Sequence, residues 1–359
     1  MVATLFSYHP VEGDRSIRGK IAIFLLLALF FTSVYCGLVF GAYDVSISDF
    51  LKSVIRNGFL ESSKSRDYLV LVNIRPPRVI LAALVGSALA ISGVLMQGLF
   101  RNPLADPGIM GVSSGSALGA VIIIVGSSLL PPFFISFFGS FTIVTGAFTS
   151  GLITTIILYF IATRNNRTSV ATMLLAGIAL SALCAAILGF LIFIANDNQL
   201  RDITFWNLGS LAGATWSRVA IACPFILTGL VIAPFLSRGM NALSLDEAVA
   251  GHLGFEVQRL KYLTIFLVAF MCGGAVSVSG NIGFIGIIVP HILRLTIGPD
   301  HRFLIPCSAL LGASMLIITD TVSRIIVAPA ELPIGIITAL IGGPFFLWIL
   351  LKQRGTLNP

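Results

Sequence analysis

The stretch ALVGSALAISGVLMQGLFRNPLADPGIMGVSSGSALG, residues 83–119, decides the fold class of this chain. It contains two apolar segments separated by the polar turn RNPLADPG at 101–108. Both segments are dense in Gly, Ala and Ser, and such small residues let helices approach closely inside a membrane. Apolar runs of about twenty residues, enough to cross ~30 Å of hydrocarbon, recur on both sides of this stretch. The pattern predicts an all-α, polytopic membrane protein.

Ten candidate spans follow from these apolar runs. The chain is 57% hydrophobic and 10% charged, which leaves no room for a separate soluble domain. We therefore expect a single transmembrane domain over residues 1–359, with a polar N-terminal tail at 1–19. The spans lie near 20–40, 78–99, 108–126, 138–162, 170–195, 217–237, 260–279, 284–297, 303–327 and 332–351.

The distribution of Lys and Arg predicts the orientation. An even number of spans puts both termini on the same side of the membrane. Lys and Arg concentrate on that side once the long connection at 41–72 is set aside, so the positive-inside rule places both termini in the cytoplasm. The net charge of +7 thus reports orientation, and not nucleic-acid binding. Within the long outer connection, residues 45–54 could form a short interfacial helix.

A polar segment, NALSLDEAVAGHLGFEVQRLK at 241–261, lies between two apolar runs on the predicted cytoplasmic side. Ser244 is followed three residues later by Glu247, the spacing of a capping box, which predicts a helix that starts at Leu245. We expect one or two short helices here. They either contact another protein or form an ordinary solvated turn.

Two groups of charged residues occur close to or within spans. Arg75 and Arg78, stiffened by the two prolines between them, form a cationic surface at the mouth of the second span or an ordinary interfacial anchor. Asp320 and Arg324 lie four apart on one helix face in the ninth span. Charges at membrane depth are functional candidates, and the alternative is a structural ion pair.

A faint internal similarity indicates how the spans are related. ALAISG at 88–93 in the second span resembles AVSVSG at 275–280 in the seventh, and these spans cross the membrane in opposite directions. This would suit an inverted repeat of spans two to five and seven to ten, a plan common in transporters. Six small and aliphatic residues can also coincide by chance.

No motif in the sequence convincingly predicts a site for catalysis, for a nucleotide or for a metal ion. GVSSG at 111–115 matches a serine hydrolase pattern, with Ser113 as nucleophile and His291 as base, but small-residue packing explains it better. The run from Gly13 to Lys20 lacks the spacing of a P-loop, so we expect no ATP site. The 4 His and 5 Cys form no ligand cluster. We expect no catalytic residue, cofactor or metal in this chain.

Several motifs together now carry a resemblance to a known family. They are RPPR at 75–78, the stretch at 83–119, LSLDEAVAGHLG at 243–254, GNIGFIGIIVPHILRL at 280–295 and ELPIGIITALIGGPFFLWILLK at 331–352. The chain resembles the permease subunits of type II ABC importers for iron-siderophores, haem and cobalamin. The resemblance covers nearly the whole chain after the first span, with the motifs in the same order.

The resemblance implies an assembly around this chain. It implies a ten-span subunit of the bacterial cytoplasmic (inner) membrane that forms a homodimer around a central pathway. Two cytoplasmic ATPase subunits would hold ATP and Mg, and an external or periplasmic binding protein would deliver the ligand. The chain itself would be a transport subunit and not an enzyme.

The resemblance also implies roles for individual residues. Arg75, Arg78 and Arg324 match outer-face arginines that pair with acidic residues of the binding protein. Coupling helices at 241–257, which seat in the ATPase, would include Ser244, Leu245, Asp246, Glu247, His252 and Leu253. The cytoplasmic gate would include Asn102, Leu104, Ser169 and Val170, where Val170 departs from a more polar residue in some relatives.

Two further sequence segments indicate an order among the candidate ligands. QLRDITFWNLGSLAGATW at 199–216 and GGPFFLWILLKQR at 342–354 look most like the haem permeases of the family, ahead of siderophore and cobalamin permeases. Arg201, Phe205 and Trp206 could belong to an outer vestibule or to an interfacial aromatic belt. An ion-coupled secondary transporter is a more distant alternative, for which Asp320 is the candidate acid.

Overall fold

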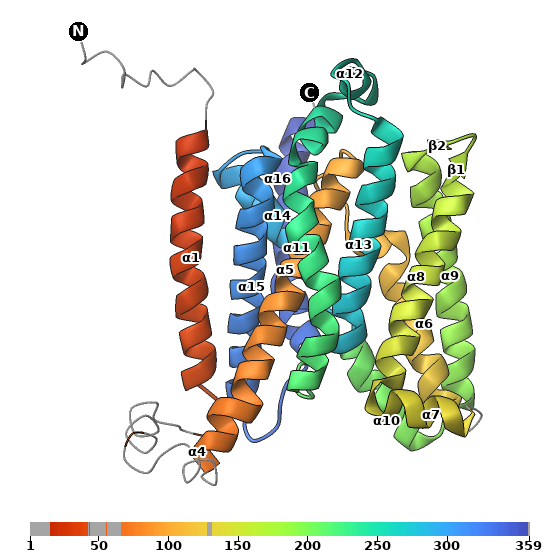
Figure 1. The fold of residues 1–359 in the computed structure, drawn as a ribbon, viewed down its shortest axis with the longest axis vertical. Helices are drawn as coiled ribbons and strands as arrows, with labels where there is room; N and C mark the ends of the chain where they lie inside the picture. The colour runs from red at the N-terminus through yellow and green to blue at the C-terminus, as the bar shows by residue number, and fades with distance from the viewer. Residues whose placement is uncertain (1–14, 42, 44–54, 56–65, 128–130, 358–359) are drawn as a thin grey trace.

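The chain folds as a bundle of helices that run roughly along one axis (Figure 1). The structure, a computed structural model, describes residues 15–41, 43, 55, 66–127 and 131–357. Each predicted span coincides with a helix, which confirms an all-α, polytopic membrane protein. These helices are α1 (Ser16–Val39), α5 (Arg75–Leu99), α6 (Val112–Val125), α8 (Thr142–Ala162), α9 (Val170–Ile194), α11 (Trp216–Leu245), α13 (Val257–Ser279), α14 (Ile285–Thr296), α15 (His301–Ile326) and α16 (Ile334–Leu357).

Length divides these helices into two groups. Within the described residues, 7 helices are long and apolar enough to cross a membrane, and α6, α14 and α16 supply shorter apolar segments. The predicted tail at 1–19 is outside the described residues up to position 14, and α1 already begins at Ser16. The predicted interfacial helix at 45–54 also lies outside the described residues.

The second span begins earlier than its hydropathy predicts. α4 (Arg66–Tyr68) and a π-helical turn, η1 (Leu69–Ile74), lead without a break into α5. Pro76, in the first turn of α5, has no N–H to donate to the carbonyl of Val72, four residues earlier. The indole of Trp216 donates to that carbonyl instead, with Nε1 3.1 Å from the oxygen. The proline thus leaves an acceptor that joins the start of α5 to the start of α11.

Residues 241–245, expected in a polar loop, belong to the long helix α11. Met240 and Leu243 are buried in the core, so the apolar face of α11 continues to its last turn. The hydroxyl of Ser244 donates to the carbonyl of Met240 and lies inside this helix. Burial of apolar side chains therefore outweighs the local capping pattern.

The short helix α12 (Glu247–His252) follows directly. Its N-cap is Asp246, whose carboxylate accepts a 2.9 Å hydrogen bond from the N–H of Ala248. The prediction that Ser244 caps a helix starting at Leu245 is therefore wrong by two residues. A short helix in this segment is present, as expected.

Several short elements have no counterpart among the predicted spans. They are the 3-10 turns η2 (Pro107–Met110) and η4 (Gly139–Phe141), the helices α7 (Pro132–Phe138) and α10 (Asp197–Leu208), and the antiparallel strands β1 (Thr163–Arg164) and β2 (Arg167–Thr168). Hydropathy misses α10 because its first turns are polar. Asn196 and Gln199 nevertheless form a capping box at its start.

α5 lies at the centre of the bundle, and 89% of its most apolar window is buried. It packs against α11, α13, α14 and α15. Glycines bring the backbones together: a Cβ built on Gly93 would lie 1.9 Å from the carbonyl oxygen of Gly286. A Cβ on Gly86 would lie 2.2 Å from the carbonyl oxygen of Gly312. The small residues at 83–119 therefore form close helix contacts, as predicted.

The first helix of each half of the chain packs against helices of the other half. α5 packs on α14 and α15 of the second half, and α13 packs on α6 and α8 of the first half. α5 and α13 also contact each other. This reciprocal packing agrees with the inverted repeat of spans two to five and seven to ten.

Different short elements lie at the two ends of the bundle (Figure 1). α12, the β1–β2 hairpin and the last turns of α16 lie at the upper end, called the α12 end below. α4, α7 and α10 lie at the lower end, called the α10 end. The predicted orientation makes the α12 end cytoplasmic.

Candidate functional site

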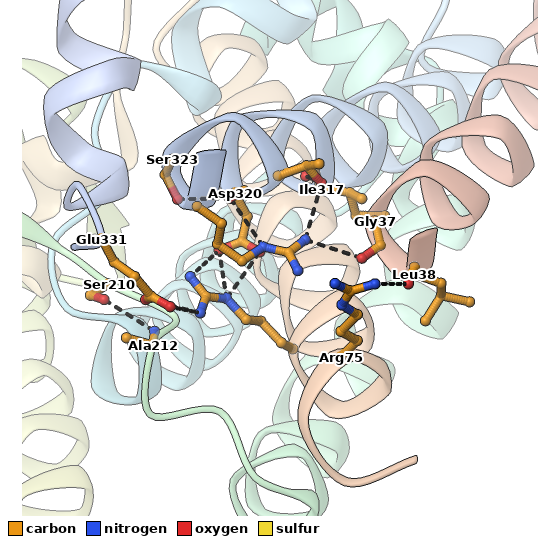
Figure 2. Close-up of polar contacts among 12 residues, drawn as sticks. Gly37, Leu38, Arg75, Ser210, Ala212, Ile317, Asp320, Ser323 and Glu331 are labelled. Carbon is orange, nitrogen blue, oxygen red and sulfur yellow. Dashed lines mark hydrogen bonds and ion pairs between the residues drawn. The ribbon is translucent and has the colours of Figure 1, made fainter. Parts of the chain in front are cut away.

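A cluster of charged side chains lies at the α10 end, where α5 begins and α15 ends (Figure 2). We call it the charge cluster; it consists of Arg75, Arg78, Asp320, Arg324 and Glu331. Its members come from α5, from α15 and from the connection between α15 and α16. It contains three of the residues expected to act in docking.

Arg78 holds the charge cluster together. Its Nε and Nη2 atoms each lie 2.9 Å from Asp320 Oδ1, and Nη1 lies 2.9 Å from Glu331 Oε1 (Figure 2). The planar guanidinium thus serves two carboxylates on different elements. This ties α5 to the end of α15 and to the connection before α16.

Arg324 and Arg75 satisfy their guanidinium groups mostly on backbone. Arg324 Nε is 3.2 Å from Asp320 Oδ2, so the predicted pair on one helix face is present. Arg324 Nη2 also donates to the carbonyl of Gly37 in α1 at 3.1 Å. Arg75 donates to the carbonyls of Leu38, Val39 and Tyr43, at the end of α1 and beyond it.

The three arginines are not an exposed surface. Their exposed fractions are 3% for Arg75, 5% for Arg78 and 6% for Arg324. The chain by itself therefore forms no exposed cationic surface at these three residues, and their role in docking stays a prediction. A guanidinium at this depth is stable only when its donors are paired, and the chain supplies these partners itself. Glu331, with 39% of its side chain exposed, is the accessible acid of the charge cluster.

At the α12 end, ionic contacts fix α12 to the rest of the bundle. Asp246 Oδ2 lies 2.8 Å from Nη1 of Arg101 in the turn after α5. Glu247 Oε1 lies 2.7 Å from Nζ of Lys261 in α13. The same Nζ donates to the carbonyl of Thr168 in β2 at 2.8 Å. α12 is thereby connected to three separate parts of the fold.

The contacts of Asp246 also determine its acidity. The N–H of Ala248 and the guanidinium of Arg101 stabilise the carboxylate, and they lower the pKa of Asp246 below its ordinary value. Asp246 is therefore ionised throughout the physiological range, where it supports both the cap and the ion pair.

α12 leaves apolar side chains in contact with solvent. Leu245, Val249 and Leu253 are large exposed hydrophobic residues, and His252 beside them is also exposed. These exposed side chains do not contribute to the packing of α12 on the bundle. A small apolar surface on a firmly anchored helix is suited to contact another protein.

The four residues expected at the cytoplasmic gate lie on two separate turns. Asn102 Oδ1 accepts from the N–H of Leu104 and shapes the turn between α5 and η2. Ser169 caps α9 by accepting from the N–H of Thr172, and Val170 is the first residue of that helix. Among the described residues of this one chain, no hydrogen bond joins these two turns.

The serine hydrolase pattern does not form a catalytic site. GVSSG at 111–115 follows η2 and opens α6, so the strand that normally precedes such a nucleophile is missing from this place. No hydrogen bond joins Ser113 and His291 in the described structure. A Cβ on Gly115 would lie 2.3 Å from Thr154 Oγ1 in α8, which identifies the pattern as close helix packing.

Sequence reasoning missed three residues that organise these sites. Glu331 begins a motif that the sequence analysis quotes, yet its partner Arg78 lies 253 residues away. Lys261 ends the polar segment at 241–261, but its burial was not expected. Arg101 lies 145 residues from its partner Asp246. No local spacing indicates such pairs.

Comparison with known proteins agrees with this architecture. A model of the FecCD transport family matches residues 25–352. The hemin transport system permease protein HmuU of Yersinia pestis is 48% identical over 284 residues, covering 79% of this chain and 83% of that protein. The cobalamin import system permease protein BtuC of Halobacterium salinarum is 43% identical over 282 residues, covering 79% and 73%.

A solved structure shows the same arrangement of helices. It is described as an inward-facing conformation of a metal-chelate type ABC transporter, and it is 33% identical with a TM-score of 0.78. The similarity covers 93% of this chain and 99% of that one. The motifs, the ten helical segments and these matches lead to one conclusion: the chain belongs to the FecCD transport family.

Proposed function

We propose that this chain is the membrane permease subunit of an ATP-driven importer that carries haem into the cytoplasm. The observation that carries the proposal is α12, a short helix fixed by Arg101 and Lys261, with the exposed Val249 on it and the exposed Leu245 and Leu253 on either side of it. A movement of a partner protein bound to such a helix can be transmitted to the bundle as rigid-body motion. The 48% identity to a hemin permease supports haem as the ligand.

The proposed assembly has five components. Two copies of this chain form a homodimer in the inner membrane, with both termini and α12 in the cytoplasm. Two ATPase subunits bind ATP and Mg and dock on α12 through Ser244, Leu245, Asp246, Glu247, His252 and Leu253. An external binding protein delivers the ligand at the α10 end. Asn102, Leu104, Ser169 and Val170 line the cytoplasmic gate where the two copies meet.

Because the three arginines are buried, they would attract a binding protein through their charge and not through direct contact. The charge cluster contains three cations and two anions, so it keeps one net positive charge. Acidic residues of a binding protein would be attracted to it, and Glu331 is the acid they would meet first. Arg75, Arg78 and Arg324 would then act through the field of the charge cluster.

Ferric siderophores and cobalamin are the alternative ligands. The 43% identity to a cobalamin permease supports this alternative. A secondary transporter driven by protons is less well supported, because Asp320 lies between two arginines and is 1% exposed. A carboxylate held in this way is a poor proton carrier.

The proposal is tested by reconstituting this chain in vesicles with its ATPase and binding protein. Binding protein loaded with haem, ferric siderophore or cobalamin is supplied outside, and uptake is followed with and without ATP inside. ATP-dependent haem accumulation is the expected result. Accumulation of another chelate contradicts the choice of ligand. Uptake that follows an ion gradient without ATP contradicts the importer itself.

A further inference from the structure

A cavity of about 380 Å³ opens at the α10 end, between α10, the start of α11 and the end of α13. Its wall contains Arg218, Trp206, Phe205, Ser210 and Asp202. Its volume lies within the range of small-molecule sites. None of the five charge-cluster side chains contributes to its wall, although Ser210 in that wall lies near Glu331 (Figure 2).

Arg218 differs from the three arginines of the charge cluster. Arg75, Arg78 and Arg324 all donate to carboxylates or carbonyls. The guanidinium of Arg218 is half-buried, and no described residue accepts a hydrogen bond from it or forms an ion pair with it within 4.0 Å. A partly desolvated guanidinium without a partner is costly, and an anionic ligand would remove that cost.

Gly213 leaves room for the guanidinium of Arg218. A Cβ built on Gly213 would lie 2.5 Å from Arg218 Nη1, so the guanidinium lies directly over this glycine. A side chain at position 213 would move the guanidinium from its present place.

A second donor lies in the same wall. Ser210 Oγ accepts a 3.1 Å hydrogen bond from the N–H of Ala212, and it donates to no acceptor among the described residues. Its hydroxyl hydrogen is available to a ligand oxygen. The hydroxyls of Ser277 and Ser279, by contrast, already donate to backbone carbonyls. Arg218 and Ser210 thus supply the donors that a carboxylate requires.

Aromatic rings complete the site. Trp206 and Phe205 come from α10 and line the same cavity as Arg218. Flat apolar groups pack well on such rings. A ligand that combines a carboxylate arm with a flat apolar body would use both features, with one edge in the cavity and the rest outside it.

We propose that Arg218, with Ser210 and the rings of Trp206 and Phe205, forms a binding site for the carboxylate arm of a flat, largely apolar metal chelate. The site lies at the end where the ligand enters, so this inference rests on the proposed import function and adds a chemical requirement to it. Chelates with free carboxylates are received here, and chelates with only amide or ester groups are not.

The test compares haem with its dimethyl ester, in which both carboxylates are blocked. The transporter, assembled with its ATPase subunits in lipid nanodiscs, is titrated with each compound, and the Soret absorption and tryptophan quenching report binding. Arg218→Gln should weaken haem binding by about tenfold or more, the loss of a charged hydrogen bond, and leave ester binding unchanged. Unchanged ester binding also shows that the variant is folded.

Three further variants sharpen the comparison. Gly213→Ala should weaken haem binding in the same selective way, because the methyl group displaces the guanidinium. Asp202→Asn should strengthen it, because a competing negative charge leaves the wall. Arg259→Gln, at an exposed arginine near α12 and far from the cavity wall, is the matched control and should change neither ligand.

Two outcomes overturn the proposal. Equal loss of haem and ester in Arg218→Gln would mean that the arginine only supports the fold. Weaker docking of the binding protein with unchanged haem affinity would mean that the carboxylate belongs to that protein. Haem uptake by the wild-type protein tests the proposed function, whereas the binding measurements test this site. A preference for acid over ester that depends on Arg218 supports the site even if haem is not transported.

Discussion

The Nζ atom of Lys261, in a side chain that is almost fully buried, lies 2.7 Å from a carboxylate oxygen of Glu247 and 2.8 Å from the carbonyl of Thr168. One ammonium group therefore joins α12, α13 and the β1–β2 hairpin. Together with the Asp246–Arg101 ion pair, this group contributes to how firmly α12 can transmit a force.

Replacement of this ammonium group should loosen α12. Lys261→Met keeps the length of the side chain and removes its charge, so Glu247 loses its ionic partner. We expect faster amide hydrogen exchange over residues 247–252 and several-fold slower ATP-dependent uptake, with ATP hydrolysis retained. Arg259→Met is the control, since the Arg259–Glu256 pair is exposed and 3.8 Å apart, and such pairs contribute little. Equal exchange rates in both variants would contradict the anchoring role.

The cap of α12 should depend on pH in a defined direction. The N–H of Ala248 and the guanidinium of Arg101 lower the pKa of Asp246, so the folded state favours the ionised carboxylate. The contribution to stability is present above the ordinary aspartate pKa of about 3.9 and is lost as the pH falls through the lower folded value. Amide exchange in α12, corrected for intrinsic rates, should rise only in that acidic range.

Asp246→Asn separates the two contacts of this residue. Asparagine is a good N-cap but carries no charge, so the cap should persist while the ion pair with Arg101 is lost. The acid-dependent rise in exchange should disappear in this variant. A rise of the same size would assign the pH dependence to another group.

Removal of Arg78 should destabilise the whole bundle. Arg78→Gln leaves Asp320, which is 1% exposed, with one cationic partner instead of two. We expect a loss of about 3 kcal/mol in the free energy of unfolding, measured with denaturant in mixed micelles. The double variant Arg78→Gln/Asp320→Asn should lose less than the sum of the single variants, because both buried charges are removed. Strict additivity would show that the pair is not coupled.

Neutralising Glu331 should strengthen docking of an acidic binding protein. Glu331→Gln raises the net charge of the charge cluster by one and removes its accessible acid. The dissociation constant for the binding protein should fall, with a larger effect at low salt. Glu256→Gln, an exposed acid beside α12, should have no effect. Unchanged docking in Glu331→Gln would exclude the charge cluster as a contact region.

Close helix packing is tested at a glycine. Gly93→Ala places a Cβ within 1.9 Å of the carbonyl oxygen of Gly286, and neither backbone can move easily. We expect a strong loss of thermal stability in detergent, of several kcal/mol. Gly189→Ala is the control, because no other atom lies within 4 Å of a Cβ there. A tolerated Gly93→Ala would show that α5 and α14 can separate without cost.

Local sequence features predicted most of the fold. Apolar runs long enough to cross hydrocarbon located every span, because a backbone in lipid must satisfy its hydrogen bonds within a helix. The helix α10 escaped this rule, since its polar first turns have no hydropathy signal. α11 ends at Leu245, eight residues beyond the predicted end of its span at 237, because burial of Leu243 outweighs the capping pattern at Ser244.

The candidate sites depended on contacts that no local pattern contains. The sequence indicates that Arg78 is important, but its burial against Asp320 and Glu331 depends on residues that lie 242 and 253 positions away in the sequence. Lys261 and Arg101 were ordinary cations in the sequence until the fold placed carboxylates beside them.

The sequence alone thus determined that the chain crosses the membrane many times, which segments cross it and to which family it belongs, because hydropathy and motif order are properties of neighbouring residues. Only the tertiary structure decided which charges are neutralised inside the bundle and which, as at Arg218, have no hydrogen-bond or ion-pair partner among the described residues. The physical reason is that the free energy of a charge in a membrane depends on the partners within a few ångströms of it, and those partners are brought there by packing between distant helices.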